Sequence, residues 1–147
     1  MQQTQNTKVI LCKTAVAAGA TDITDATAVD TSGYNGVRFI FTMGTITSGA
    51  ATSVAACSLA TSSPTPGTDD IAGSKITVVD TADDTVFILD IYRPQLRYVR
   101  PFVKRATQNA VVNSIVAVLY EPKTMPVTKD ATVTGQTVLV SPANGTA

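Results

Sequence analysis

Histidine is absent from the 147 residues, so the chain lacks the side chain that most often serves as a general base or a metal ligand. Catalytic arrangements that combine histidine with serine or cysteine are therefore impossible. The two cysteines, Cys12 and Cys57, lie far apart in the chain and form no Cys-x-x-Cys pair, so no zinc site is expected. Leu11 before Cys12 and two alanines before Cys57 are typical of strands and predict reduced, packed thiols.

Two pairs of adjacent aspartates, Asp69-Asp70 and Asp83-Asp84, are groups that could bind calcium or hydrolyse a glycosidic bond. Both pairs stand among turn-forming residues, and adjacent residues of a strand point to opposite faces. Solvated turns are therefore the favoured interpretation, with a calcium site as the alternative. Glycine-rich phosphate loops are also missing, so we expect no cofactor and no enzymatic activity.

Charged side chains are unevenly distributed, although the formal net charge is zero. Six acids and one base lie between residues 69 and 90, whereas residues 93–105 contain five bases and no acid. The five bases are Arg93, Arg97, Arg100, Lys104 and Arg105. They either pair with acids of neighbouring strands inside the monomer or face an acidic surface of another subunit. They are the candidate contact residues of the chain.

Composition restricts the partners further. Charged residues make up only 15% of the chain, so no overall field attracts nucleic acid or an anionic membrane. The first eight residues are polar and no apolar run reaches the length of a membrane span, so neither a secretory signal nor a membrane segment is predicted. We expect synthesis and assembly in a cytoplasm. A chain of 147 residues fits one domain, 1–147, with its own core.

Turn signals and alternating apolar residues predict eight or nine short strands and no amphipathic helix. The strands are expected within 7–16, 22–33, 37–43, 52–59, 75–79, 85–92, 96–104 and 110–120, with weaker alternation over 132–140. This pattern is typical of a single all-β domain, and we predict a β-sandwich, jelly-roll-like or similar.

Four local features of these strands lead to specific expectations. Asn35-Gly36 predicts a turn, and residues 45–48 predict a hairpin loop that pairs the strands on either side. Both faces of 85–92 are apolar, which indicates a strand covered on both sides. Pro101 indicates an edge or a bulge, because proline has no N–H to donate.

Three segments are expected to lie outside the strands. Residues 60–73 carry two prolines, two aspartates and no periodicity, which predicts a long exposed loop and a candidate contact element. Residues 1–6 are expected to form an N-terminal arm, and residues 141–147 an extended C-terminal tail.

Two long stretches, YNGVRFIFTMGTITSGA (34–50) and DIYRPQLRYVRPFVKRATQNA (90–110), resemble small virion proteins of tailed bacteriophages, in particular capsid cement (decoration) proteins. The resemblance covers about half the chain. It implies a protein of the virion's capsid surface, assembled in the bacterial host cytoplasm, that stabilises contacts between major capsid subunits. The implied partners are the major capsid protein and the protein itself, as a dimer or trimer. No catalytic residues come with the resemblance.

Two alternatives stay open beside this interpretation. Head-tail connector and tail proteins can also be small and β-rich, so the fold does not choose among virion roles. A lectin-like carbohydrate-binding module would need exposed aromatic side chains, and without tryptophan the candidates are Tyr34, Tyr92, Tyr98 and Tyr120.

Overall fold

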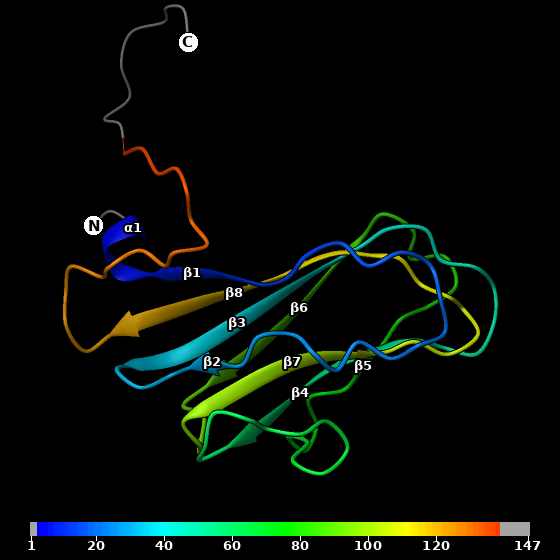
Figure 1. The fold of residues 1–147 in the computed structure, drawn as a ribbon, viewed down its shortest axis with the longest axis horizontal. Helices are drawn as coiled ribbons and strands as arrows, with labels where there is room; N and C mark the ends of the chain where they lie inside the picture. The colour runs from blue at the N-terminus through cyan, green and yellow to red at the C-terminus, as the bar shows by residue number, and fades with distance from the viewer. Residues whose placement is uncertain (1–2, 139–147) are drawn as a thin grey trace, which may run out of the picture.

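The structure, a computed structural model, describes residues 3–138 and is a sandwich of two antiparallel sheets (Figure 1). Sheet A has the strand order β1-β8-β3-β6 and sheet B the order β2-β7-β4-β5. The strands are β1 (Lys8–Lys13), β2 (Val29–Asp30), β3 (Tyr34–Met43), β4 (Ser53–Leu59), β5 (Ile76–Thr77), β6 (Val86–Tyr92), β7 (Tyr98–Lys104) and β8 (Val112–Pro122). The predicted all-β sandwich is confirmed.

The alternation of β3 builds the centre of the core. Val37, Phe39, Phe41 and Met43 point between the sheets and are at most 1% exposed. β3 lies between β8 and β6, so both of its edges are paired. Buried valines of β4 and β7 face it from sheet B. The burial of these side chains drives the two sheets together.

The predicted hairpin around residues 45–48 is wrong, because β3 and β4 lie in different sheets. Residues 44–47 bond to the segment before β8 instead: Gly44 N–H donates to the Val111 carbonyl at 2.9 Å, and Thr47 N–H donates to the Gln108 carbonyl at 3.0 Å. Glycines indicated a change of direction there, but they carry no information about which strand becomes the partner.

The predicted turn at Asn35-Gly36 is also wrong, since both residues lie inside β3. The chain turns just before them, at Gly33, whose φ is 89°. Gly36 has a packing role instead: a Cβ at this position would lie 2.2 Å from Cζ of Tyr120, so only glycine leaves room for that ring.

The strand β6 was expected to be covered on both sides, and this expectation is wrong. β6 is an edge strand of sheet A, and its Val86 and Ile88 side chains are 55% and 54% exposed. Pro101 lies in β7, between β2 and β4, and is opposite Ala56 of β4 in an unbroken register, so the predicted edge strand or bulge is wrong. Val103 exchanges backbone bonds with Ile23, so Pro101 faces the same side, between Ile23 and β2, where no donor is required.

The segments outside the strands follow the expectations in part. Residues 60–73 are largely exposed as predicted, although Ile71 N–H donates to the Ala56 carbonyl and ties the loop back to β4. At the N-terminus, the short helix α1 (Gln3–Asn6) replaces an extended arm over the described residues. The predicted tail 141–147 lies outside the described residues.

Residues 123–138, here called the C-terminal strap, form no strand, so the weak alternation after 132 was misleading over the part described. The strap runs beside β1 (Figure 1): Leu11 N–H donates to Thr132 Oγ1 at 3.1 Å, and Lys8 pairs with Asp130 at 3.4 Å. Its backbone also reaches α1, where Val127 N–H donates to the Gln5 carbonyl.

Both cysteines are free and buried, which confirms the predicted packed thiols. Cys12 lies in the core at β1, and Cys57 packs with Ala55 and Phe102 in a small second cluster. Burial raises the pKa of the Cys12 thiol to about 12 and that of Cys57 to about 11. In the described part of the chain, no helix is long and apolar enough to cross a membrane.

Candidate contact surface

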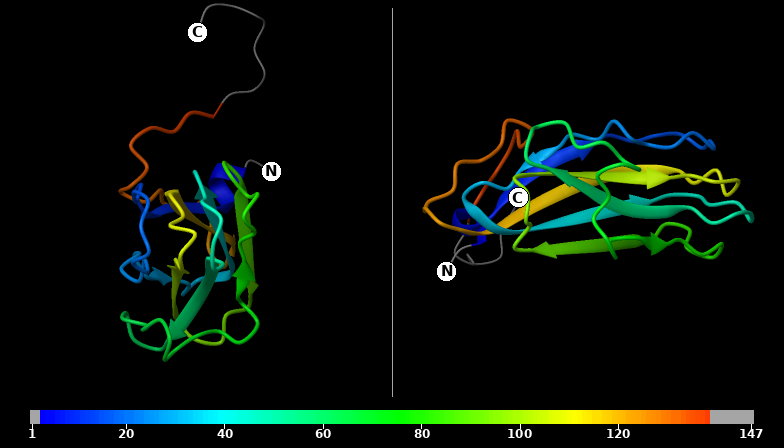
Figure 2. Two further views of the ribbon diagram at one scale, coloured as in Figure 1. Left: turned by 90° about the vertical axis from the view of Figure 1, so that its right-hand side faces the viewer. Right: turned by 90° about the horizontal axis from the view of Figure 1, so that it is seen from below.

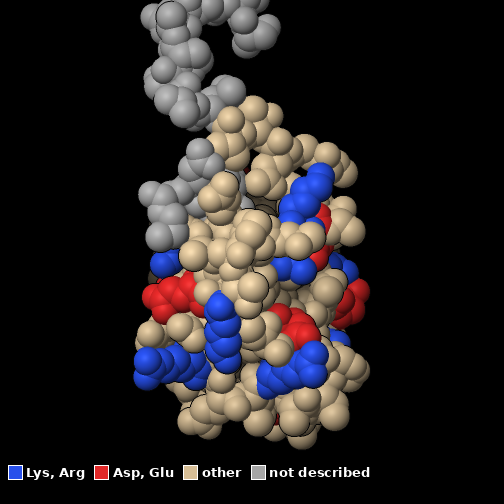
Figure 3. Space-filling view, turned by 90° about the vertical axis from the view of Figure 1, so that its left-hand side faces the viewer, with Lys and Arg blue, Asp and Glu red and all other residues tan. Residues whose placement is uncertain are grey.

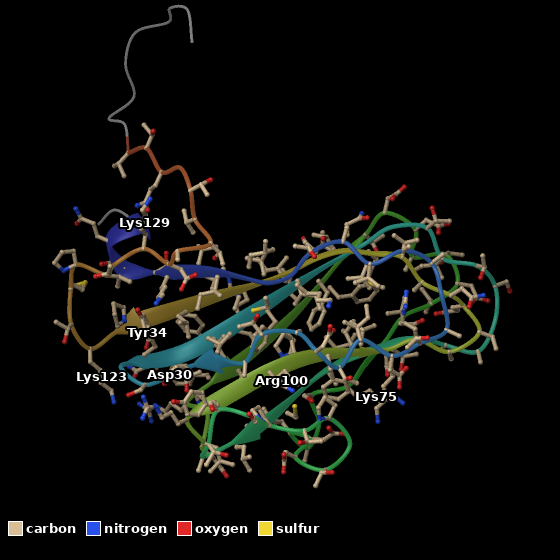
Figure 4. All side chains as sticks on the ribbon, in the orientation of Figure 1. Asp30, Tyr34, Lys75, Arg100, Lys123 and Lys129 are labelled. Carbon is tan, nitrogen blue, oxygen red and sulfur yellow. The ribbon has the colours of Figure 1, made fainter. Side chains whose placement is uncertain are left out.

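One end of the sandwich is built from three loops, 31–35, 93–97 and 121–123, which we call the loop end (left in Figure 4). Backbone bonds lock the three loops together. Lys123 N–H donates to the Gly33 carbonyl at 2.8 Å, and Arg93 N–H donates to the Asn35 carbonyl at 2.7 Å. Because backbone groups make these bonds, the loops form a rigid base on which exposed side chains such as Arg93 and Lys123 can make contacts.

A shallow cleft of about 610 Å³ opens between these loops. Arg93, Arg97 and Lys123 contribute basic groups to its lining, and Tyr34 contributes an aromatic ring. Seen from this end, the surface carries several Lys and Arg side chains interspersed with acidic ones (Figure 3). Such a surface suits a partner with exposed carboxylates better than it suits a polyanion, which would meet the acids as well.

Two residues of the loop end have a backbone conformation that is unusual for their type. Arg93 has a φ of 51° and Glu121 a φ of 50°, both in the left-handed region that favours glycine. Side chains in this conformation cost the fold energy and concentrate at sites of function. Arg93 is also exposed, with its guanidinium 5.2 Å from the ring centre of Tyr92, so its side chain is the strongest contact candidate.

Arg97 is largely neutralised within the fold. Its guanidinium binds Asp30 through two hydrogen bonds of 3.0 and 2.7 Å and lies over the ring of Tyr98. The bond from Arg97 holds the pKa of Asp30 below its usual range. The pair is exposed, so Arg97 can still reach a partner, but it brings its own carboxylate with it.

Arg100 and Lys104 lie on a different surface, the outer face of sheet B. They share this face with Tyr98 and Phe102, because every second residue of β7 points the same way. Lys104 Nζ lies 5.7 Å from the ring centre of Phe102. Arg100 makes one long hydrogen bond, 3.5 Å to the Thr24 carbonyl, and its buried Nε has no hydrogen-bond partner. This second basic surface is separate from the loop end.

Arg105 is buried at the opposite end of the sandwich and belongs to no contact surface of the monomer. Its side chain is part of a residue only 6% exposed, and it donates to the backbone carbonyls of Ala17, Thr21 and Ala110. The structure therefore divides the five predicted contact residues among the loop end, sheet B and the interior.

The acids between 69 and 90 do not pair with the bases between 93 and 105 in the described residues. Most of them serve turns: Asp69 and Asp70 accept from the loop backbone, and Asp83 accepts from Ile46 N–H at 2.6 Å. Asp90 pairs with Arg38. Pairing between these two segments is thus wrong, although Arg97 does pair inside the monomer with Asp30 of the neighbouring strand β2. The turn interpretation of the aspartate pairs is confirmed.

Sequence patterns did not identify Lys123 and Tyr34 as members of the loop end. Both stand next to strand ends, Lys123 after β8 and Tyr34 at the start of β3, and β3 pairs with β8 through Tyr34 and Pro122. Knowing that pairing would have been the only signal, because the two residues are far apart in the chain. Within residues 3–138, no cluster of three or more potential metal-ligating side chains occurs.

A scan of the chain against protein-family models finds no match, and a search of curated protein sequences finds no significant match.

Proposed function

We propose that this protein is a virion structural protein that binds the outside of a phage head and stabilises contacts between major capsid subunits. The observation that carries the proposal is the overlap of two features. The segment 90–110 bears the resemblance to cement proteins, and its residues 93–97 are also one of the three segments of the loop end. Part of the segment that resembles the family therefore lies on an exposed surface held by backbone bonds.

The physical role follows from binding without chemistry. A domain held by a β core presents fixed side chains, so little conformational entropy is lost on contact with a capsid. Each bound copy stabilises the assembled state through its affinity, and many copies bind neighbouring subunits of one shell. The near absence of net charge keeps nucleic acid from competing for the surface.

The test uses capsids that lack this protein, to which purified protein is added back. We expect wild-type protein to bind and to raise the temperature at which the capsids release their genome. The double variant Arg93→Ala, Lys123→Ala is expected to bind at least about tenfold more weakly. The charge-matched control Lys75→Ala, Lys129→Ala removes two bases outside the loop end and should bind as wild type does.

Two results would contradict the cement role, and a third would contradict the contact through the loop end. If capsids without the protein are as stable as complete ones, the protein is no cement. A copy number of about a dozen per particle, measured on a stained gel, would indicate a connector position, since that number fits a single symmetric ring and not an array over the whole shell. Equal binding of the two double variants would remove the loop end as the contact.

A further inference from the structure

The free edge of β6 carries unused backbone groups. β6 has β3 as its single neighbour, and no segment of the described chain lies along its other side (Figure 2). Met43 N–H donates to the Thr85 carbonyl and Arg93 N–H to the Asn35 carbonyl, so odd-numbered residues direct their backbone groups at β3. The N–H and C=O groups of the even-numbered residues therefore point away from β3, out of the free edge of the sheet. These residues are Val86, Ile88, Asp90 and Tyr92.

The other three sheet edges are short or covered. β2 and β5 have two residues each. β1 is overlaid by the C-terminal strap at Leu11 and interrupted by a register shift between Leu11 and Lys13. β6, by contrast, has seven residues, an unbroken register with β3, and neither lysine nor proline. Proteins use short, covered or interrupted edges to prevent pairing, and among the four edge strands of the described residues β6 alone is long, uncovered and uninterrupted.

The β6 side chains on the outer face of sheet A are apolar or aromatic, except for Asp90. Val86, Ile88 and Tyr92 are 54–55% exposed. Ile88 also ends a row of apolar residues that crosses the outer face of sheet A. The row consists of Leu11, Val116, Ile40 and Ile88, one from each strand. An apolar face that ends at an open backbone edge is typical of a surface that binds another protein.

Asp90, the one charged residue of β6, is already satisfied within the monomer. Arg38 donates to it through two bonds of 3.0 and 2.8 Å, and the Tyr120 hydroxyl donates to it at 2.6 Å. This edge therefore presents no uncompensated charge that would repel an identical edge. It offers donors and acceptors in equal number, which is the requirement for pairing with its own kind.

We propose that β6 pairs antiparallel with β6 of a second copy and joins two copies of sheet A into one continuous sheet. The twofold axis passes between the two Leu89 residues. Val86 of one copy then lies opposite Tyr92 of the other copy, and Ile88 lies opposite Asp90 of the other copy. In this register all four outward residues fall in hydrogen-bonded pairs, about eight bonds in total, and the two Asp90 side chains are not directly opposite. The pairing depends on β6 alone and does not require a capsid.

The first experiment measures self-association of the purified full chain by sedimentation equilibrium over a wide range of concentrations. We expect a monomer–dimer equilibrium. Ile88→Glu places a negative charge opposite Asp90 of the other copy and should weaken the dimer at least about tenfold. Val79→Glu makes the same change at a side chain that is 59% exposed outside β6, and should leave the equilibrium unchanged. A wild-type monomer at all concentrations, or equal effects of the two variants, would overturn the proposal.

Amide hydrogen exchange then identifies the edge itself. The N–H groups of Ile88 and Asp90 point away from the monomer, whereas those of Phe87 and Leu89 point at β3. We expect protection of the first two to rise with protein concentration, while the last two stay protected throughout. Dimers in which Ile88 and Asp90 exchange as fast as in the monomer use another surface, and that result would refute pairing through β6.

Discussion

Replacing Arg105 should destabilise the fold far more than replacing any other member of the basic segment 93–105. Its guanidinium is buried and donates to three backbone carbonyls, those of Ala17, Thr21 and Ala110, with the Thr21 bond at 2.7 Å. These carbonyls belong to segments 17–21 and 110, which are joined on the backbone by the Val16–Val112 bridge and by the bond from Gly19 N–H to the Asn109 carbonyl. Arg105 thus ties the connection between β1 and β2 to the start of β8.

The size of the effect follows from the bonds that are lost. A hydrogen bond to a charged donor contributes about 1.5–3 kcal/mol, and the cost of burying the guanidinium offsets part of the total for three. Arg105→Ala leaves the three carbonyls without their donor. We expect a loss of about 3–5 kcal/mol, a large fraction of the stability of a domain of this size.

Urea unfolding followed by circular dichroism measures this loss, together with thermal melting, where we expect a drop of roughly 10 °C. Arg105→Lys keeps the charge but has no planar fork, so an intermediate loss is expected. The control is Arg97→Ala, which removes an exposed arginine with an equally good partner and should change stability little. If Arg105→Ala unfolds at the same urea concentration as Arg97→Ala, the reasoning from burial and bonding is refuted.

Three further predictions concern packing, reactivity and pH. Gly36→Ala should cost about 1–3 kcal/mol in urea unfolding because its methyl group would meet the Tyr120 ring, and the cost should shrink when Tyr120 is already alanine; equal costs in both backgrounds would exclude this contact as the cause. Cys12 and Cys57 should resist alkylation at pH 8 until urea unfolds the chain, since burial raises both pKa values above 10; rapid labelling of folded protein would contradict their burial. Carboxylates such as Asp30 have a pKa that falls on folding, so their contribution to stability is complete above the unfolded pKa of about 3.9 and is lost as pH falls through the lower folded value. Thermal melts should therefore be level between pH 5 and 8, where the chain has no histidine to titrate, and should fall below about pH 4; a transition near pH 6.5 would contradict this account.

Sequence patterns predicted where the strands lie in the chain better than they predicted which strands are neighbours in a sheet. The alternation of Phe39 and Phe41 in β3 and the apolar run that became β8 were sufficient to place strands, because a strand's burial pattern is local. The same local patterns misassigned β6. Its apolar residues on both faces fit a covered strand, but Val86 and Ile88 lie on an open face of the sheet edge.

For the candidate surface, the sequence identified a basic segment, and the tertiary structure decided which of its bases are exposed, paired or buried. Arg93, Arg97 and Arg105 are similar in the sequence, and whether each is free, paired or buried depends on Asp30, on carbonyls of 17–21 and on the path of the loops around them. These partners come from distant parts of the chain, so no spacing rule could specify them.

The amino-acid sequence by itself determined that the chain has no histidine chemistry, no net charge and an all-β strand pattern, because these properties depend on residue types and short spacings. Only the tertiary structure decided which bases share a surface and which strand is left with an open edge. Both depend on the order of strands in two sheets, and that order is set by the burial of the whole core at once.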